Sequence, residues 1–139
     1  MQVKIKHEQI GQAIDLLFHL SLKGKQSRHR TTFIKKLTER LHEVEGQRND
    51  LAKEHSFLDE EGNPKMLDNG KRYDIKDMEA FQKDVQELYE EELVLEGGDN
   101  QRMLTTVKEV LLNSDESYSG KKALTYDYLC EQFEEADLS

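Results

Sequence analysis

The stretch Phe33–Leu51, FIKKLTERLHEVEGQRNDL, decides the fold, because its apolar residues return at steps of three and four. Such spacing is typical of a long helix that packs one apolar stripe against another helix. It predicts a helix over 27–56, capped by Ser27 and about 40 Å long at roughly 1.5 Å per residue. Arg48 falls on the stripe, where it either sets pairing specificity or reaches the edge of the seam. The apolar members are Phe33, Ile34, Leu37, Leu41, Val44 and Leu51.

A second long helix is expected over 76–96, with Asp77 as its cap, because the same spacing returns there. Two matching stripes predict an antiparallel helical hairpin. Residues 57–75 lie between the two helices and contain the turn signals Gly62–Pro64 and Asp68–Gly70, which predict a small β-hairpin. The second stripe consists of Met78, Phe81, Val85 and Leu88.

The two ends of the chain complete a mainly α fold with a minor α+β character. Val3 and Ile5 alternate with lysines, so 1–24 is expected to hold a short strand or extended arm and then a helix. Leu93–Leu95 is either a strand or the end of the second long helix, and 99–135 has the spacing of two C-terminal helices. We therefore expect a single domain of 139 residues, in which short helices flank the helical hairpin and its β-hairpin insertion.

Charge is divided unevenly along the chain. Residues 1–56 hold 11 Lys and Arg against 7 Asp and Glu, whereas 57–139 hold 9 against 22, and the net charge is −9. An asymmetry of this kind bears on partners rather than on fold. A single cysteine, the lack of a long apolar run and a charged N-terminal start predict a cytoplasmic protein that does not enter a membrane.

The strongest functional lead is a basic segment at the expected start of the long helix. Arg28, His29 and Arg30 fall in the expected first turn, where the helix dipole favours anions. We expect this segment to bind a protein partner. Nucleic acid is an alternative, although the net charge of −9 argues against strong non-specific DNA binding. A third interpretation pairs the segment with Glu90–Glu92 and Glu96 of the same chain or of a second copy. The predicted basic contact residues are Lys23, Lys25, Arg28, His29, Arg30 and Lys35.

An acidic surface is the rival candidate. In this alternative the protein mimics the charge of phosphate and inhibits a host defence complex or a nucleic-acid-handling complex. The predicted acidic contact residues are Glu87, Glu90, Glu91, Glu92, Glu134 and Glu135.

No pattern points to catalysis, a metal or a cofactor, so we expect a non-enzymatic protein. Glu39 and His42 share one helical face, but a di-iron bundle needs a second pair of this kind. Asp59–Asn63 begins like a calcium loop, yet Gly70 stands where the closing glutamate belongs. Cys130 lies among apolar residues and is expected to pack as one of them.

Three stretches, Leu22–Thr31, Asp59–Pro64 and Tyr126–Glu131, resemble a family of small proteins encoded by phages and prophages of Gram-positive bacteria and catalogued as a domain of unknown function. The resemblance runs over most of the chain and implies a virus-encoded protein in a bacterial cytoplasm. It implies no activity and assigns no functional residue. We therefore expect an accessory protein that binds a phage or host protein, in virion assembly or in the manipulation of a host factor. The sequence leaves open whether the chain forms a homo-oligomer.

Overall fold

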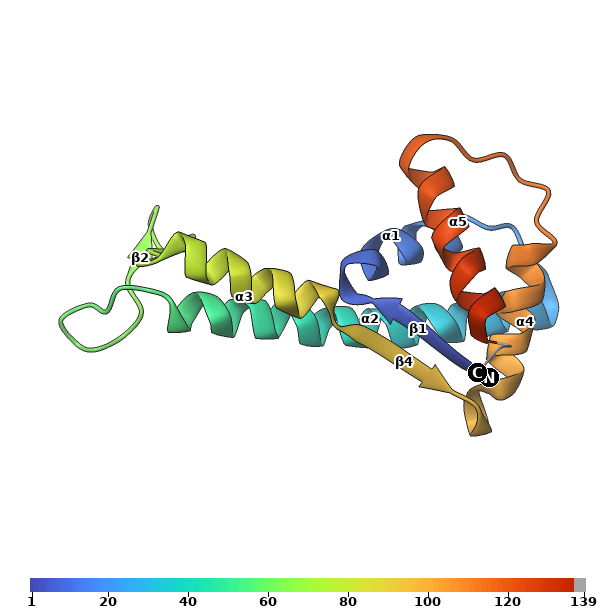
Figure 1. Ribbon diagram of the computed structural model, residues 1–139, viewed down its shortest axis with the longest axis horizontal. Helices are drawn as coiled ribbons and strands as arrows, with labels where there is room; N and C mark the ends of the chain where they lie inside the picture. The colour runs from blue at the N-terminus through green and yellow to red at the C-terminus, as the bar shows by residue number, and fades with distance from the viewer. Residues whose placement is uncertain (137–139) are drawn as a thin grey trace. The chain divides into compact units, whose positions relative to one another are not determined.

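The computed structural model describes residues 1–136, which are mostly helical and contain two small antiparallel β pairs (Figure 1). The predicted fold class, mainly α with a minor β part, is confirmed. Among these residues there is no helix with the length and apolar character to cross a membrane. The elements are β1 (Gln2–Lys6), α1 (His7–Phe18), α2 (Gly24–Glu54), β2 (Met66–Leu67), β3 (Arg72–Tyr73), α3 (Met78–Glu90), β4 (Glu92–Glu96), the short 3-10 helix η1 (Gly98–Asn100), α4 (Gln101–Leu112) and α5 (Gly120–Glu135).

The described chain divides into two compact units. We call residues 1–41 and 92–136 the core unit, and residues 42–91 the hairpin unit. The reason for the division is the distribution of buried apolar side chains. Every member of the large hydrophobic cluster lies in the core unit.

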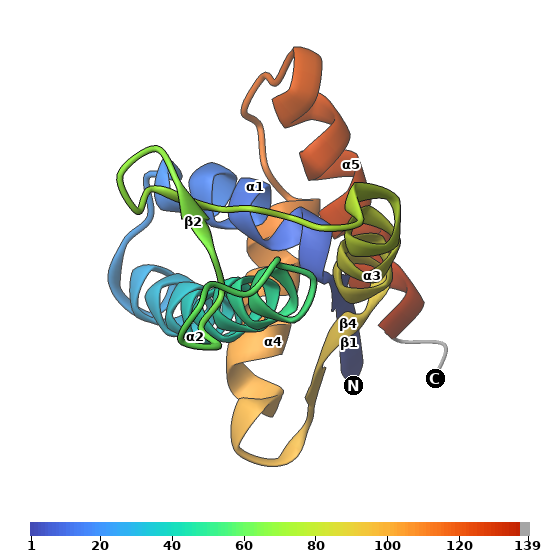
Figure 2. The same cartoon turned by 90° about the vertical axis from the view of Figure 1, so that its left-hand side faces the viewer.

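The core unit contains a two-stranded antiparallel sheet of β1 and β4 (Figure 2). Val3 pairs with Leu95 and Ile5 with Leu93, and all four side chains are buried. The prediction that the second long helix continues to residue 96 is therefore wrong, because α3 ends at Glu90. Leu93 and Leu95 alternate with exposed residues, as expected for a strand with one buried face. The alternative prediction, a strand at Leu93–Leu95, is therefore confirmed.

Helices α1, α4, α5 and the first part of α2 bury their apolar faces in the core unit. The predicted pair of C-terminal helices is present as α4 and α5. Phe33 of α2 meets Phe133 of α5 edge to face, with ring centroids 5.7 Å apart, and neither residue has any exposed surface. Burial of each such side chain contributes about 1.5–3 kcal/mol to stability. Leu37, Leu104 and Leu129 are likewise fully buried.

Helix α2 begins at Gly24 and ends at Glu54, so the predicted range 27–56 is shifted at both ends. The shift at the start comes from Gly24, whose φ of +53° is a conformation that glycine adopts readily. Ser27 is consequently not the cap. It lies inside the helix, and its Oγ accepts a hydrogen bond of 3.5 Å from Nη2 of Arg30.

The hairpin unit contains the predicted antiparallel helical hairpin, formed by residues 42–54 of α2 and by α3 (Figure 1). Asp77 caps α3 as predicted, because its Oδ1 accepts a hydrogen bond from the backbone N–H of Ala80 at 3.1 Å. His55 Nε2 bonds to Asp84 Oδ2 at 2.6 Å across the two helices. The guanidinium of Arg48 lies 5.8 Å from the centre of the Phe81 ring, and Arg48 is exposed, so this residue reaches the edge of the seam.

The predicted β-hairpin is present as β2 and β3, in which Met66 pairs with Tyr73 and Leu67 with Arg72. The position of its turn was predicted correctly from the Asn69-Gly70 pair. Asp68, Asn69 and Gly70 have φ values of 53°, 59° and 84°, a left-handed region that asparagine, aspartate and glycine tolerate best.

Candidate interaction surfaces

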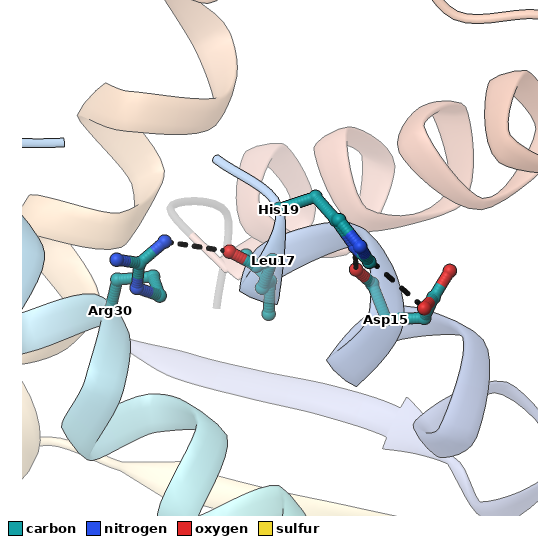
Figure 3. Close-up of polar contacts among 4 residues, drawn as sticks. All are labelled: Asp15, Leu17, His19 and Arg30. Carbon is teal, nitrogen blue, oxygen red and sulfur yellow. Dashed lines mark hydrogen bonds and ion pairs between the residues drawn. The ribbon is translucent and has the colours of Figure 1, made fainter. Parts of the chain in front are cut away.

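Two of the predicted basic contact residues, Arg30 and His29, have structural roles in the core unit. Where α1 ends, Arg30 Nη1 donates to the carbonyl oxygen of Leu17 at 2.9 Å (Figure 3). The same atom donates to the carbonyl oxygen of Leu20 at 2.6 Å. A cation at the C-terminal end of a helix is stabilising, because the carbonyl groups there lack partners and carry partial negative charge. His29 Nδ1 lies 2.7 Å from Thr106 Oγ1 and ties α2 to α4.

The other four basic residues form an exposed surface, which we call the basic stripe: Lys23, Lys25, Arg28 and Lys35. Positions 25, 28 and 35 share one face of α2, opposite the face that buries Phe33 and Leu37. Arg28 lies in the second turn of the helix, so the expected placement in the first turn is wrong.

The basic stripe is not neutralised within its own unit. In the described part of the core unit, its four side chains make no hydrogen bond or ion pair. Glu96, a proposed internal partner, instead accepts a hydrogen bond of 2.7 Å from Gln2 Nε2. The interpretation that pairs the basic segment with acidic residues of the same chain therefore finds no support in the core unit.

The six predicted acidic residues are all exposed, but they do not belong to one unit. Glu92, Glu134 and Glu135 lie in the core unit, and Glu87, Glu90 and Glu91 lie in the hairpin unit. In the core unit, several carboxylates lie close enough to Tyr128 to affect its pKa. Burial raises the pKa of Tyr128, and the charges of Glu92, Glu8 and Glu135 raise it further, against a lowering by the hydrogen bond from the Lys6 N–H.

Three of the acidic residues thus belong to the hairpin unit, and two of them line a groove of about 500 Å³ between its two helices, which we call the acidic groove. Leu51 and Leu88 supply apolar surface, and five carboxylates surround it. The sequence analysis names Glu87 and Glu91 but not the other three. Asp84 lies three residues before Glu87 on α3, whereas Asp50 and Glu54 lie four residues apart on α2. The acidic lining residues are Asp50, Glu54, Asp84, Glu87 and Glu91.

A second cavity of the hairpin unit has the opposite character, and we call it the basic pocket. Its volume is about 400 Å³, and Arg48, Lys71 and Arg72 lie at its wall with Glu45 as the one acidic residue. Arg72 is already paired, since its Nε lies 2.7 Å from Asp68 Oδ2. The remaining lining residues are Asn49, Ala52, Tyr73, Ile75, Met78 and Phe81.

Sequence reasoning did not single out the basic pocket, although Lys71-Arg72-Tyr73 is a visible cluster of cations and an aromatic ring. Its assembly depends on the β-hairpin folding back toward α2 and α3, which no local pattern specifies. Among residues 1–136, no group of three His, Cys, Asp or Glu side chains is arranged to hold a metal ion. Asp59 closes its own turn, because its Oδ1 accepts from the N–H groups of Glu61 and Asn63, each at 2.9 Å.

The groups with shifted pKa values lie in the packed part of the core unit. Burial raises the pKa of the Cys130 thiol, so this half-buried cysteine is a weak nucleophile at neutral pH. Burial also raises the pKa of Tyr126 to about 12, and its hydroxyl donates to the carbonyl oxygen of Leu111. Tyr118 stacks on Tyr126 with ring centroids 4.7 Å apart. Tyr118 and Tyr126 thus pack against each other and against the hydrophobic cluster of the core unit.

Comparison with known proteins gives one match. A family described as "Protein of unknown function (DUF1617)" matches residues 1–139. No curated protein and no solved structure matches the chain.

Proposed function

The chain belongs along its whole length to this family of unknown function, and from its geometry we propose that it is a non-enzymatic accessory protein that binds another protein. We propose that the protein is encoded by a phage that infects Gram-positive bacteria and that it acts in the host cytoplasm. That part rests on the sequence resemblance. The binding role rests on the surface of the hairpin unit.

One observation carries the proposal: residues 42–91 expose four large hydrophobic side chains and bury three. The buried ones are Val44, Phe81 and Leu88, and the exposed ones are Phe57, Leu58, Met66 and Met78. Leu58 is 65% exposed and Phe57 44% exposed. Exposed apolar side chains bordered by charged residues are characteristic of surfaces that bind another protein.

A second candidate function uses the acidic groove. Five carboxylates around Leu51 and Leu88 offer a basic protein both charge and apolar contact. This observation favours an inhibitor that occupies the phosphate-binding cleft of a nucleic-acid-handling or defence protein. The groove lies in the hairpin unit, whereas Glu92, Glu134 and Glu135 of the predicted acidic surface lie in the core unit and are not part of it.

The test is quantitative affinity capture from phage-infected cells with a tagged chain. Wild type is compared with Leu58→Ser in the hairpin unit and with Leu124→Ser, a matched control at a 72% exposed leucine of the core unit. We expect a partner protein to copurify with wild type and with Leu124→Ser. The recovered amount of this partner should fall about tenfold or more with Leu58→Ser. Recovery that is equal for all three chains contradicts the proposal.

The same capture separates the two candidates. Glu87→Gln/Glu91→Gln should leave the apolar-dependent partner bound and should release a basic partner of the acidic groove. Circular dichroism of each variant verifies that the helices are intact.

A further inference from the structure

The hairpin unit carries both the basic pocket and an exposed segment of complementary chemistry. The segment is Phe57–Glu61, in which two apolar side chains are followed by Asp59, Glu60 and Glu61. All five residues are exposed. None of them lines the basic pocket.

The segment is held in a defined shape. The backbone of Phe57 bonds to that of Asp74 at 2.9 Å, and the Asp59 N–H bonds to the Asn63 carbonyl at 2.8 Å. The Oδ1 of Asp59 accepts hydrogen bonds within the turn itself, but the side-chain carboxylates of Glu60 and Glu61 make no hydrogen bond or ion pair within residues 1–136. A preformed segment loses little conformational entropy when it binds.

The basic pocket offers the complementary groups. Ala52, Ile75, Met78 and Phe81 provide an apolar lining, and Phe81 is held under the guanidinium of Arg48. Arg48 and Lys71 are exposed. With Arg72 engaged by Asp68, they are the two cations of the pocket that form no ion pair with a carboxylate within residues 1–136. The hairpin unit as a whole has 7 Lys and Arg against 15 Asp and Glu, so a pocket with three cations and one acid is a local reversal of charge.

We propose that the Phe57–Glu61 segment of one copy inserts into the basic pocket of a second copy of this chain. Phe57 and Leu58 contact the apolar lining, and Glu60 and Glu61 pair with Arg48 and Lys71. Because the segment and the pocket are parts of the same unit, a two-fold dimer makes this contact twice and leaves no open end. The inference rests on the same exposed apolar residues as the proposed function and names their partner as a second copy.

Sedimentation velocity of the purified full-length chain tests the proposal over a range of protein concentrations. We expect a concentration-dependent dimer that weakens as salt is raised, since its charge pairs lie near the surface. Arg48→Glu/Lys71→Glu and Glu60→Lys/Glu61→Lys should each raise the dissociation constant about tenfold or more. Lys53→Glu/Lys83→Glu is the matched control, because it makes the same change of charge at two exposed positions, on α2 and α3, away from the pocket.

The decisive measurement is the mixture of the two charge-reversed chains. Each has lost its own dimer, but together they form two complementary contacts, one with the wild-type charges and one with both charges reversed. The mixture should therefore dimerise more strongly than either chain alone. A wild-type chain that stays monomeric overturns the proposal, as does a dimer that survives both reversals. A foreign acidic protein held in the pocket of a monomeric chain overturns it in favour of another occupant.

Folding of the variants is checked by circular dichroism, and Arg48→Gln/Lys71→Gln replaces the reversal if it fails to fold. The outcome is separable from that of the proposed function. A monomeric purified chain removes the second copy as partner, whereas the capture from infected cells asks whether a different protein binds Leu58 and its neighbours.

Discussion

The core unit and the hairpin unit use their apolar residues in different ways. In the core unit, side chains such as Phe33, Leu104 and Leu129 are sealed from solvent on every side. In the hairpin unit, Phe57 and Leu58 remain exposed, and two charged cavities lie against its helices. We propose from this contrast that the core unit supplies stability and that the hairpin unit supplies the binding surface. The predictions that follow test this division.

The largest effect is expected for Phe33→Ala in the core unit. The change removes a fully buried ring and its edge-to-face partner contact with Phe133, at a cost of about 3–5 kcal/mol in the free energy of unfolding. Urea denaturation followed by circular dichroism measures it. Leu58→Ala in the hairpin unit should change the same quantity by less than about 0.5 kcal/mol, and a comparable loss there would contradict the division.

Two neighbouring arginines of α2 are expected to differ in their contribution to stability. Arg30→Ala leaves the Leu17 and Leu20 carbonyls without their donor and should lower the free energy of unfolding by about 1–3 kcal/mol. Arg28→Ala removes an exposed side chain and should change it by less than about 0.5 kcal/mol. Urea titrations of the two variants side by side provide the measurement and the control. Equal losses would mean that Arg30 is no more structural than Arg28.

A smaller effect, confined to the hairpin unit, is expected for His55→Ala. The change removes the hydrogen bond to Asp84 and should cost about 0.5–1.5 kcal/mol. Hydrogen exchange should become faster in α3, with little change in the amides of α4 and α5. Faster exchange throughout both units would show that they do not open separately.

The smallest effect is a loss of core stability at alkaline pH. The pKa of Tyr126 is raised from 10.0 to about 12 in the folded chain, so the unfolded chain releases this proton first as the pH rises. The contribution is complete below pH 10 and is lost as the pH rises through about 12. Urea titrations at several pH values should show a falling midpoint in this window, and Tyr126→Phe should reduce the slope. A slope that is unchanged in this variant would assign the effect to Tyr118 or Tyr128.

Much of the fold followed from local patterns. The stripes of α2 and α3 predicted the helical hairpin, Asp77 predicted its cap, and Asn69-Gly70 predicted the β turn. The end of α3 was misplaced because Leu93 and Leu95 fit a helix end as well as a strand. Only the pairing with β1, which begins about ninety residues earlier in the chain, decides between them.

The candidate surfaces were harder to predict from sequence. Arg28 and Arg30 have the same charge and were assigned the same role, yet helical phase separates them. Arg30 lies three residues before Phe33 and seven before Leu37, which places it on the buried face. The basic pocket has no such signal, because its lining comes from α2, β3 and α3 together.

The pairing of β1 with β4 has a consequence for how the chain emerges from the ribosome. Gln2 pairs with Glu96, and the Lys6 N–H donates to the Tyr128 hydroxyl. Strand β1 can therefore complete its contacts only after almost the whole polypeptide has been translated. At about 5–20 residues per second, this delay lasts several seconds or more. The contacts of residues 42–91 are closer in sequence and can form during that interval. Nascent chains of this protein therefore present the hairpin unit before the rest is complete.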